Sequence, residues 1–143
     1  MVWGEHEWEG NELCDGMAGG NFDILRPNII ICGGFTALLR MITIAKTHGV
    51  LVMPSCSVEH GSGIALAATI QASAAVPWNP VNAEQETNAK EPMIIMLSHN
   101  TLNIRNQFLV QKIDSSGRYL HVLEAPGLGT TVNEQVLNRP IAI

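Results

Sequence analysis

Two carboxylates flank an imidazole near the start of the chain, in the sequence Glu5-His6-Glu7. Carboxylate oxygens are the ligands that Mg²⁺ prefers, and the ion usually keeps water or substrate oxygens at its other positions. Glu5 is therefore a candidate metal ligand, and His6 is a candidate contact for a substrate. Because one carboxylate does not make a metal site, a solvated acidic loop is the alternative interpretation of this segment.

Two further polar positions follow apolar segments. Asn28 comes after Asp23–Pro27, and its neutral amide cannot act as a base but can hydrogen-bond to a substrate oxygen or to nearby backbone. Ser55 opens a polar segment that reaches His60, a second candidate contact for a substrate. No G-x-S-x-G motif surrounds Ser55, so the sequence does not indicate a nucleophilic serine.

These positions lie at or just beyond the carboxyl ends of predicted strands, in a repeating strand-helix pattern. The expected strands are Met1–Gly4, Asp23–Ile31, Val50–Pro54 and Pro92–Leu97, and the expected helices are Glu9–Gly19, a segment from Thr36 to His48, and Gly63–Ala75. Ligands bind beyond the carboxyl ends of parallel strands, whether the units form an open doubly wound sheet or part of a barrel. The pattern predicts an α/β fold with one shared site at the strand ends.

Several details of these elements are open to a structural check. Pro27 is expected where the ladder of its strand ends, because proline has no N–H to donate. Thr36 is expected to cap the following helix. A β-hairpin is expected near the carboxyl end, with arms at Phe108–Ile113 and Tyr119–Leu123 around the turn Asp114–Arg118.

Composition excludes several classes of function. The 143 residues suit one domain, and 46% apolar residues are typical of a chain with a packed core. A net charge of −5, with eight scattered Lys and Arg, argues against a nucleic-acid partner. No segment is long and apolar enough for a membrane span, and the acidic amino end does not resemble a secretory signal. Three cysteines without a CxxC motif indicate reduced thiols and a cytoplasmic protein.

Five segments of the chain are similar, in order, to a known family: GEHEW, DILRPNIIICGGFTALLRMITIAKTHGV, VMPSC, GSGIALAATIQASAAVP and EAPGLGTTVNEQVL. They resemble the carboxyl half of the mandelate racemase and muconate lactonizing enzymes of the enolase superfamily, in particular the acid-sugar dehydratases and cycloisomerases. The resemblance implies the C-terminal portion of a modified (β/α)7β TIM-type barrel, with residues 1–143 forming one partial domain of about strands 5 to 8 and a tail. It also implies Mg²⁺ bound to a substrate carboxylate and a base that removes the α-proton.

The resemblance assigns roles to particular positions. Glu5 matches the third metal-binding carboxylate of the family. Asn28 stands where the family keeps an aspartate base, and the histidine partner of that base is replaced by Ser55 or Val58, with His60 as the nearest imidazole. Both members of the family's acid-base pair are thus substituted in this chain.

A further carboxylate on the family's last strand has no certain counterpart. It falls at Ile95 in one alignment and at Glu84 or Glu86 in another. A complete barrel takes about 200 to 250 residues, so the two earlier metal carboxylates are expected to be absent. Open strand edges then favour self-association or completion by a complementary half-barrel.

Two functions follow as expectations. In the first, the chain is the C-terminal part of a Mg²⁺-dependent dehydratase, racemase or cycloisomerase acting on a small sugar acid, and it is inactive on its own. In the second, it is a catalytically silent sugar-acid binding or scaffold domain that retains the fold without the acid and base.

Overall fold

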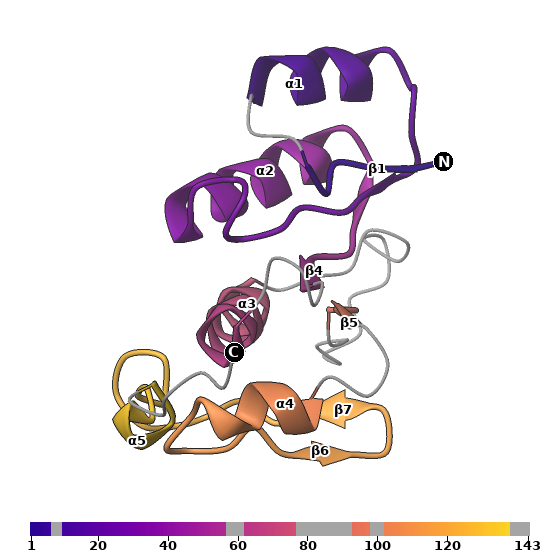
Figure 1. Ribbon diagram of the computed structural model, residues 1–143. Helices are drawn as coiled ribbons and strands as arrows, with labels where there is room; N and C mark the ends of the chain where they lie inside the picture. Colours follow the sequence, from indigo (N-terminus) through magenta and orange to yellow (C-terminus); the bar gives the residue numbers. More distant parts are fainter. Residues whose placement is uncertain (7–9, 57–61, 77–92, 98–101, 138–143) are drawn as a thin grey trace.

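The computed structural model describes residues 1–6, 10–56, 62–76, 93–97 and 102–137 (Figure 1). Short parallel strands alternate with helices over most of this length, as the sequence predicts. The elements in chain order are β1 (Val2–Trp3), α1 (Gly10–Ala18), β2 (Ile24–Leu25), α2 (Phe35–Thr47), β3 (Leu51–Val52), β4 (Ser55–Cys56), α3 (Gly63–Ala75), β5 (Met96–Leu97), α4 (Leu102–Gln107), β6 (Ser115–Ser116), β7 (Tyr119–Leu120) and α5 (Glu134–Leu137).

The parallel strands form two ladders. β2 lies between β1 and β3 in one, and β4 pairs with β5 in the other. An isolated parallel bridge between Asn28 and Ser55 continues the pairing beyond β2 and β3, so the two lines of chain run side by side to their carboxyl ends. The expected strand ends therefore lie next to one another, as a shared site requires.

The strand expected over Asp23–Ile31 is shorter than predicted. Backbone bonds from the β3–β4 line to Leu25 O and Pro27 O, both 2.8 Å, keep it paired as far as Asn28. The chain then turns, because the Cys32 N–H donates to Asn28 O at 2.9 Å. The prediction that pairing stops close to Pro27 is confirmed, while the residues after Asn28 form a turn and not a strand.

Helices α1 to α4 form a row in which each packs on the next. α2 contacts α1, α3 and β3, and α3 contacts α4 and β4 (Figure 1). Leu25 is fully buried. It lies on the helix side of the sheet, since a Cβ atom built at Gly4 would meet Leu25 Cδ1 and would lie 3.6 Å from Cδ2 of Leu13 in α1. Side chains alternate along a strand, so Arg26 and Asn28 belong to the opposite face of the sheet.

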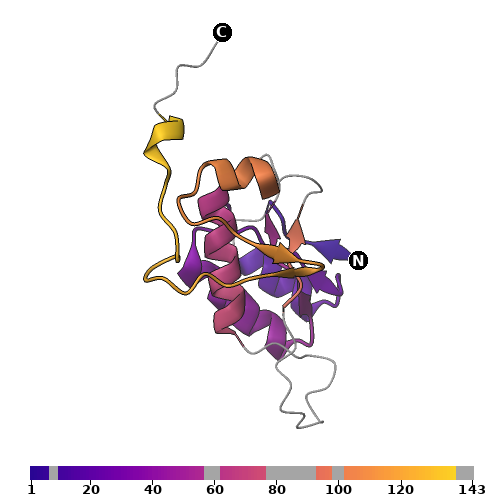
Figure 2. The same ribbon diagram turned by 90° about the horizontal axis from the view of Figure 1, so that it is seen from below.

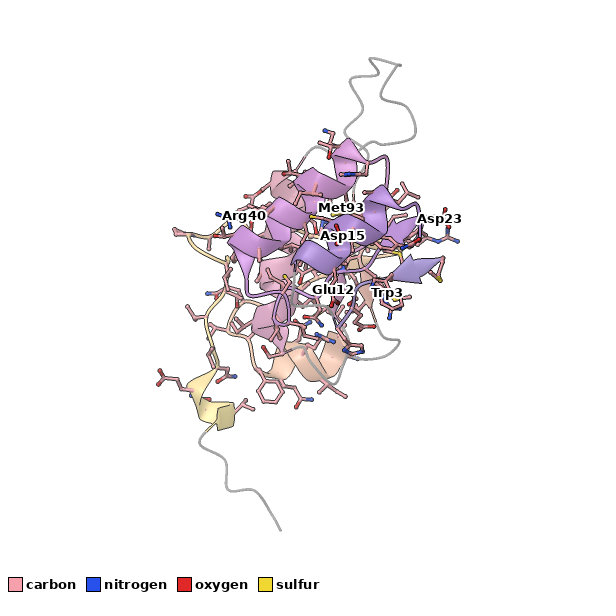
Figure 3. All side chains as sticks on the ribbon, turned by 90° about the horizontal axis from the view of Figure 1, so that it is seen from above. Trp3, Glu12, Asp15, Asp23, Arg40 and Met93 are labelled. Atoms are coloured by element: carbon pink, nitrogen blue, oxygen red, sulfur yellow. The ribbon has the colours of Figure 1, made fainter. Side chains whose placement is uncertain are left out.

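The outer helices are charged on their solvent side. Glu12 and Asp15 of α1 and Arg40 of α2 are exposed (Figure 3). The buried stripe of α2 consists of Leu38, Met41, Ile42 and Ala45, which lie three and four positions apart on one face of the helix. Among the described helices, none has both the length and the apolar character needed to cross a membrane.

The start of α2 corrects one prediction. Thr36 is not the cap, because the residue before the helix is Gly34 and no side chain bonds to the first turn. Gly34 has φ 97°, a backbone conformation that glycine adopts without strain. A tight left-handed turn therefore sets the helix start where the sequence suggested a hydroxyl.

Helix α3 has the bounds that the sequence predicts. Ser62 caps it by accepting a hydrogen bond from the Ala65 N–H at 3.3 Å. A Cβ atom at Gly63 would lie 2.5 Å from the Arg105 carbonyl oxygen in α4. The close approach of α3 and α4 therefore depends on glycine at this position.

The carboxyl-terminal part differs from the expectation in its first arm. β6 and β7 pair antiparallel, with Ser115 opposite Leu120, but Phe108–Ile113 is not a strand. Ile113 is buried, and the Asn106 side chain bonds both its N–H and its carbonyl oxygen at 2.8 Å. The sequence also did not predict α4 or α5, the latter lying at the edge of the molecule (Figure 2).

Candidate functional site

The candidate residues lie at the carboxyl ends of neighbouring parallel strands. Glu5 follows β1, Asn28 follows β2, and Ser55 begins β4 in the next line of chain. This is where parallel α/β folds place ligands. The described part of the site divides into two pairs, Asn28 with Ser55 and Glu5 with Arg26.

The Asn28–Ser55 pair is buried and incompletely bonded. Each residue is only 2% exposed. Asn28 Oδ1 accepts a hydrogen bond from the Ile30 N–H at 3.0 Å, but Asn28 Nδ2 and Ser55 Oγ have no partner. A buried polar group without a partner costs about 1–3 kcal/mol, so these two atoms favour binding an acceptor oxygen.

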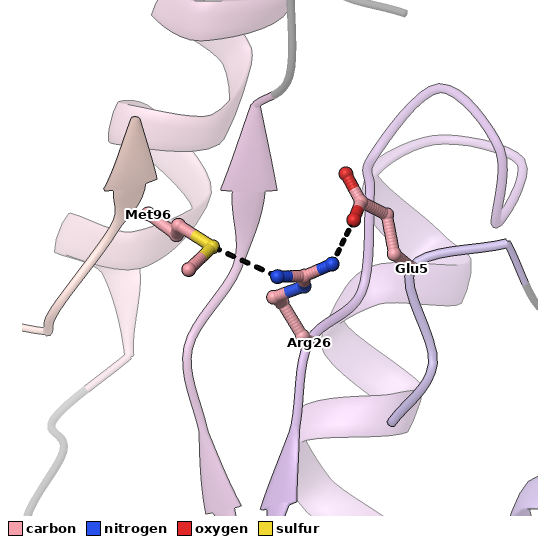
Figure 4. Close-up of polar contacts among 3 residues, drawn as sticks. All are labelled: Glu5, Arg26 and Met96. Carbon is pink, nitrogen blue, oxygen red and sulfur yellow. Dashed lines mark hydrogen bonds and ion pairs between the residues drawn. The ribbon is translucent and has the colours of Figure 1, made fainter. Parts of the chain in front are cut away.

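Glu5 forms an ion pair with Arg26 (Figure 4). The Arg26 guanidinium donates to Glu5 Oε2 through Nη2, and to Met96 Sδ through Nη1 at 3.0 Å. The side chains of Glu5 and Arg26 are 14% and 28% exposed. One guanidinium thus links the end of β1 to β5 across the intervening strands.

The described residues do not form a set that fits Mg²⁺. No group of three or more His, Cys, Asp or Glu that could hold a metal ion occurs within the described ranges. Glu5, the carboxylate expected to bind the ion, has a guanidinium on its oxygen. Mg²⁺ requires several oxygen ligands. The described part of the site offers one carboxylate, Glu5, and the charge of Arg26 already balances it.

The remaining predicted residues are only partly placed. His6 is exposed directly after Glu5, and Ile95 is half-buried directly before β5. His60, Val58, Glu84 and Glu86 lie outside the described residues. The structure brings Asn28 and Ser55 together through a parallel bridge.

Sequence reasoning missed two arginines. Arg26 could have been found as a charge within the apolar segment Phe22–Ile31, on the same face of its strand as Asn28. Arg105 is 3% exposed and donates to the Cys56 carbonyl oxygen at 2.7 Å and to Cys56 Sγ at 2.8 Å. Arg105 also donates to the Ser62 carbonyl oxygen at 3.5 Å. It therefore links the last residue of β4 to the residue that caps α3.

The cysteines are free thiols with different access to solvent. Burial raises the pKa of the Cys56 thiol, an effect that the nearby Arg105 charge opposes. Burial likewise raises the pKa of Cys32, while backbone hydrogen bonds lower it. Cys14 is half-buried, the most accessible of the three.

We expect Cys14 to react first with a thiol reagent in the folded protein. The thiolate is the reactive form, and Cys32 and Cys56 are both buried and disfavoured as thiolates. Reaction with 5,5′-dithiobis(2-nitrobenzoate), followed by peptide mass spectrometry, identifies the modified residue. Labelling of Cys56 at the rate of Cys14 would contradict the buried position of the Cys56–Arg105 contact, and denatured protein should label all three equally.

Comparisons with known proteins match nearly the whole chain. The family model described as enolase C-terminal domain-like matches residues 1–136. D-galactarolactone cycloisomerase of Agrobacterium fabrum is 30% identical over 138 residues, which are 95% of this chain and 34% of that protein. The chain therefore spans about a third of the length of this curated relative.

Solved structures show the same fold. A mandelate racemase/muconate lactonizing enzyme from Jannaschia sp. CCS1 gives a TM-score of 0.75 at 18% identity, covering 96% of this chain and 31% of that one. An enolase from Pantoea ananatis with bound D-gluconate and Mg gives a TM-score of 0.73 at 19% identity, covering 94% of this chain and 29% of the other.

Proposed function

Because this chain belongs to the enolase C-terminal domain-like family, we propose that it supplies the carboxyl-terminal strands of a TIM-type barrel that binds a sugar acid at its mouth. The pairing of Asn28 with Ser55 at the strand ends is the observation that carries this proposal. Two relatives support the ligand class, since one is named for D-galactarolactone and another holds D-gluconate.

The unpartnered atoms suit an acid with several oxygens. Asn28 Nδ2 donates hydrogen bonds, and Ser55 Oγ both donates and accepts. A carboxylate or hydroxyl oxygen of the ligand would complete both groups and remove the cost of burying them. We assign these residues to binding and orientation of the ligand.

The reaction class proposed for the complete barrel is dehydration, racemisation or cycloisomerisation, which begins with removal of a proton next to a carboxylate. Such a step needs a base, and a general base must change its protonation state. Neither the Asn28 amide nor the Ser55 hydroxyl does so near neutral pH. Neither Asn28 nor Ser55 is therefore the base in this proposal, and both are assigned to holding the acid.

A barrel also needs strands beyond those described here. Within the described residues, β1 and β5 each have one strand neighbour. We propose that both edges pair with further strands, from the rest of the same protein, a complementary half-barrel or a second copy. Reading frames upstream of Met1 would separate the first of these arrangements from the other two.

The test is binding without exchange. We expect calorimetry to detect D-gluconate or a related aldonic or aldaric acid, with roughly tenfold weaker affinity for Asn28→Ala, because one hydrogen bond is lost. Proton NMR in deuterated water with added MgCl₂ should show no exchange of the α-proton by this chain. Asn133→Ala, a half-buried amide in the carboxyl-terminal segment, is the control and should bind like the original protein.

The outcomes separate two functions. Appreciable exchange by the chain alone would overturn the assignment of Asn28 and Ser55 to binding. Tight binding that is independent of Mg²⁺ and occurs without exchange would favour a catalytically silent sugar-acid binding domain. The neutral side chains of Asn28 and Ser55 suit that function, because they bind an acid without accepting its proton. No binding across the panel would count against both.

A further inference from the structure

We propose that Arg26 is the permanent counter-ion of Glu5, so that this part of the site is held by a guanidinium in the place where the family resemblance expects Mg²⁺. The proposal is independent of the ligand proposed above. It starts from the disagreement between the expected metal ligand and the contacts that the structure gives it.

The backbone places the two side chains together. The Arg26 N–H donates to Trp3 O at 2.6 Å, which brings Arg26 beside the end of β1. Leu25 faces helix α1, so Arg26 extends from the opposite face of the sheet, toward which Glu5 also reaches (Figure 4). The pair thus follows from the register of β1 on β2 and needs no loop rearrangement.

Both terminal nitrogens of the Arg26 guanidinium donate hydrogen bonds. Nη2 donates to Glu5 Oε2, and Nη1 donates to Met96 Sδ on β5. The planar guanidinium presents its donors in a rigid arrangement, so fixing two of them sets the position of the charge. The restricted exposure of both side chains also limits screening of the pair by water.

A divalent cation would compete poorly for this carboxylate. Reaching Glu5 requires displacing Arg26, and the displaced positive charge would remain on the neighbouring strand and repel the ion. The described residues offer no cluster of additional carboxylates to compensate for that repulsion. The charge that Glu5 needs is therefore built into the chain.

A double-mutant cycle in the full chain tests the pairing. Glu5→Gln, Arg26→Gln and the double variant are unfolded in urea, in EDTA and again in excess MgCl₂. We expect a coupling of about fivefold in the unfolding equilibrium constant, equal in the two solutions. Glu124→Gln, which removes an exposed carboxylate, is the matched control and should show no coupling to Arg26→Gln.

Metal binding gives a second measurement that does not require the Arg26 variant to fold. Electron paramagnetic resonance of added Mn²⁺ reports the unbound ion, and we expect the same titration for the original protein and for Glu5→Gln. Absence of coupling between Glu5 and Arg26 would overturn the proposal. So would Mn²⁺ binding that disappears in Glu5→Gln, or Mg²⁺ stabilisation that depends on Glu5. Neither result bears on sugar-acid binding by Asn28 and Ser55, so the two proposals fail separately.

Discussion

Truncation of Leu66 to alanine is expected to lower the free energy of unfolding by about 3 kcal/mol. Leu66 is fully buried in the first turn of α3, the helix that packs against both α2 and α4. Removing its branched end loses the free energy gained when those apolar atoms leave water on folding. It also leaves a cavity that the flanking helices cannot fully close. The effect should extend to the site, because α3 also supports β4.

Urea unfolding followed by circular dichroism measures this change. Ile104→Ala is the control, since Ile104 in α4 is 54% exposed and its truncation should cost less than about 0.5 kcal/mol. Equal effects of the two substitutions would show that α3 does not occupy the interior position described here.

Replacement of Arg105 by methionine should cost about 3 kcal/mol. Methionine retains much of the apolar stem but cannot donate, so the Cys56 carbonyl oxygen loses its 2.7 Å bond in a buried setting. The contact with the Ser62 carbonyl oxygen is lost as well. We also expect faster labelling of Cys56, because its surroundings open when the chain between β4 and α3 is no longer fastened.

Two variants make the Arg105 experiment specific. Gln107→Met introduces the same side chain at an exposed position of the same helix and should be close to neutral. Arg105→Lys keeps a positive charge but not the fork of donors, so it should recover only part of the stability. Unchanged stability and unchanged Cys56 labelling in Arg105→Met would show that the two carbonyl contacts do not hold this part of the fold.

Helices α1, α2 and α3 were the most predictable elements of the molecule. Ser62 provides a cap, the residues after it are small or apolar, and Val76 is followed by Pro77, so local signals fixed both ends of α3. Helix α4 was missed because Leu102–Gln107 is only six residues long and its buried residue is an arginine, which ordinarily indicates a solvent face. The position of this helix depends on tertiary contacts of Arg105 with Cys56 and Ser62.

The site was predictable only as far as strand order could place it. Sequence alone indicated that Asn28 and Ser55 follow neighbouring strands, and the bridge between them agrees. The ion pair of Glu5 with Arg26 depends on the register of β1 on β2, and the Arg26 contact with Met96 spans 70 positions in sequence. Neither relation has a local signal, so the carboxylate type of Glu5 and the family resemblance indicated a metal ligand but not the ion pair.

The alternation of side chains along the strand lines has a consequence for how this site can diverge. In the β2 line, Leu25 and Pro27 are buried toward the helices, whereas Arg26 and Asn28 carry the polar contacts of the other face. Alternate positions along this strand therefore serve different purposes: one set supports the folded core, and the other determines which ligand binds. A library that randomises only the polar-face positions should yield many folded proteins with altered selectivity, while the same diversity shifted by one residue should yield few that fold at all.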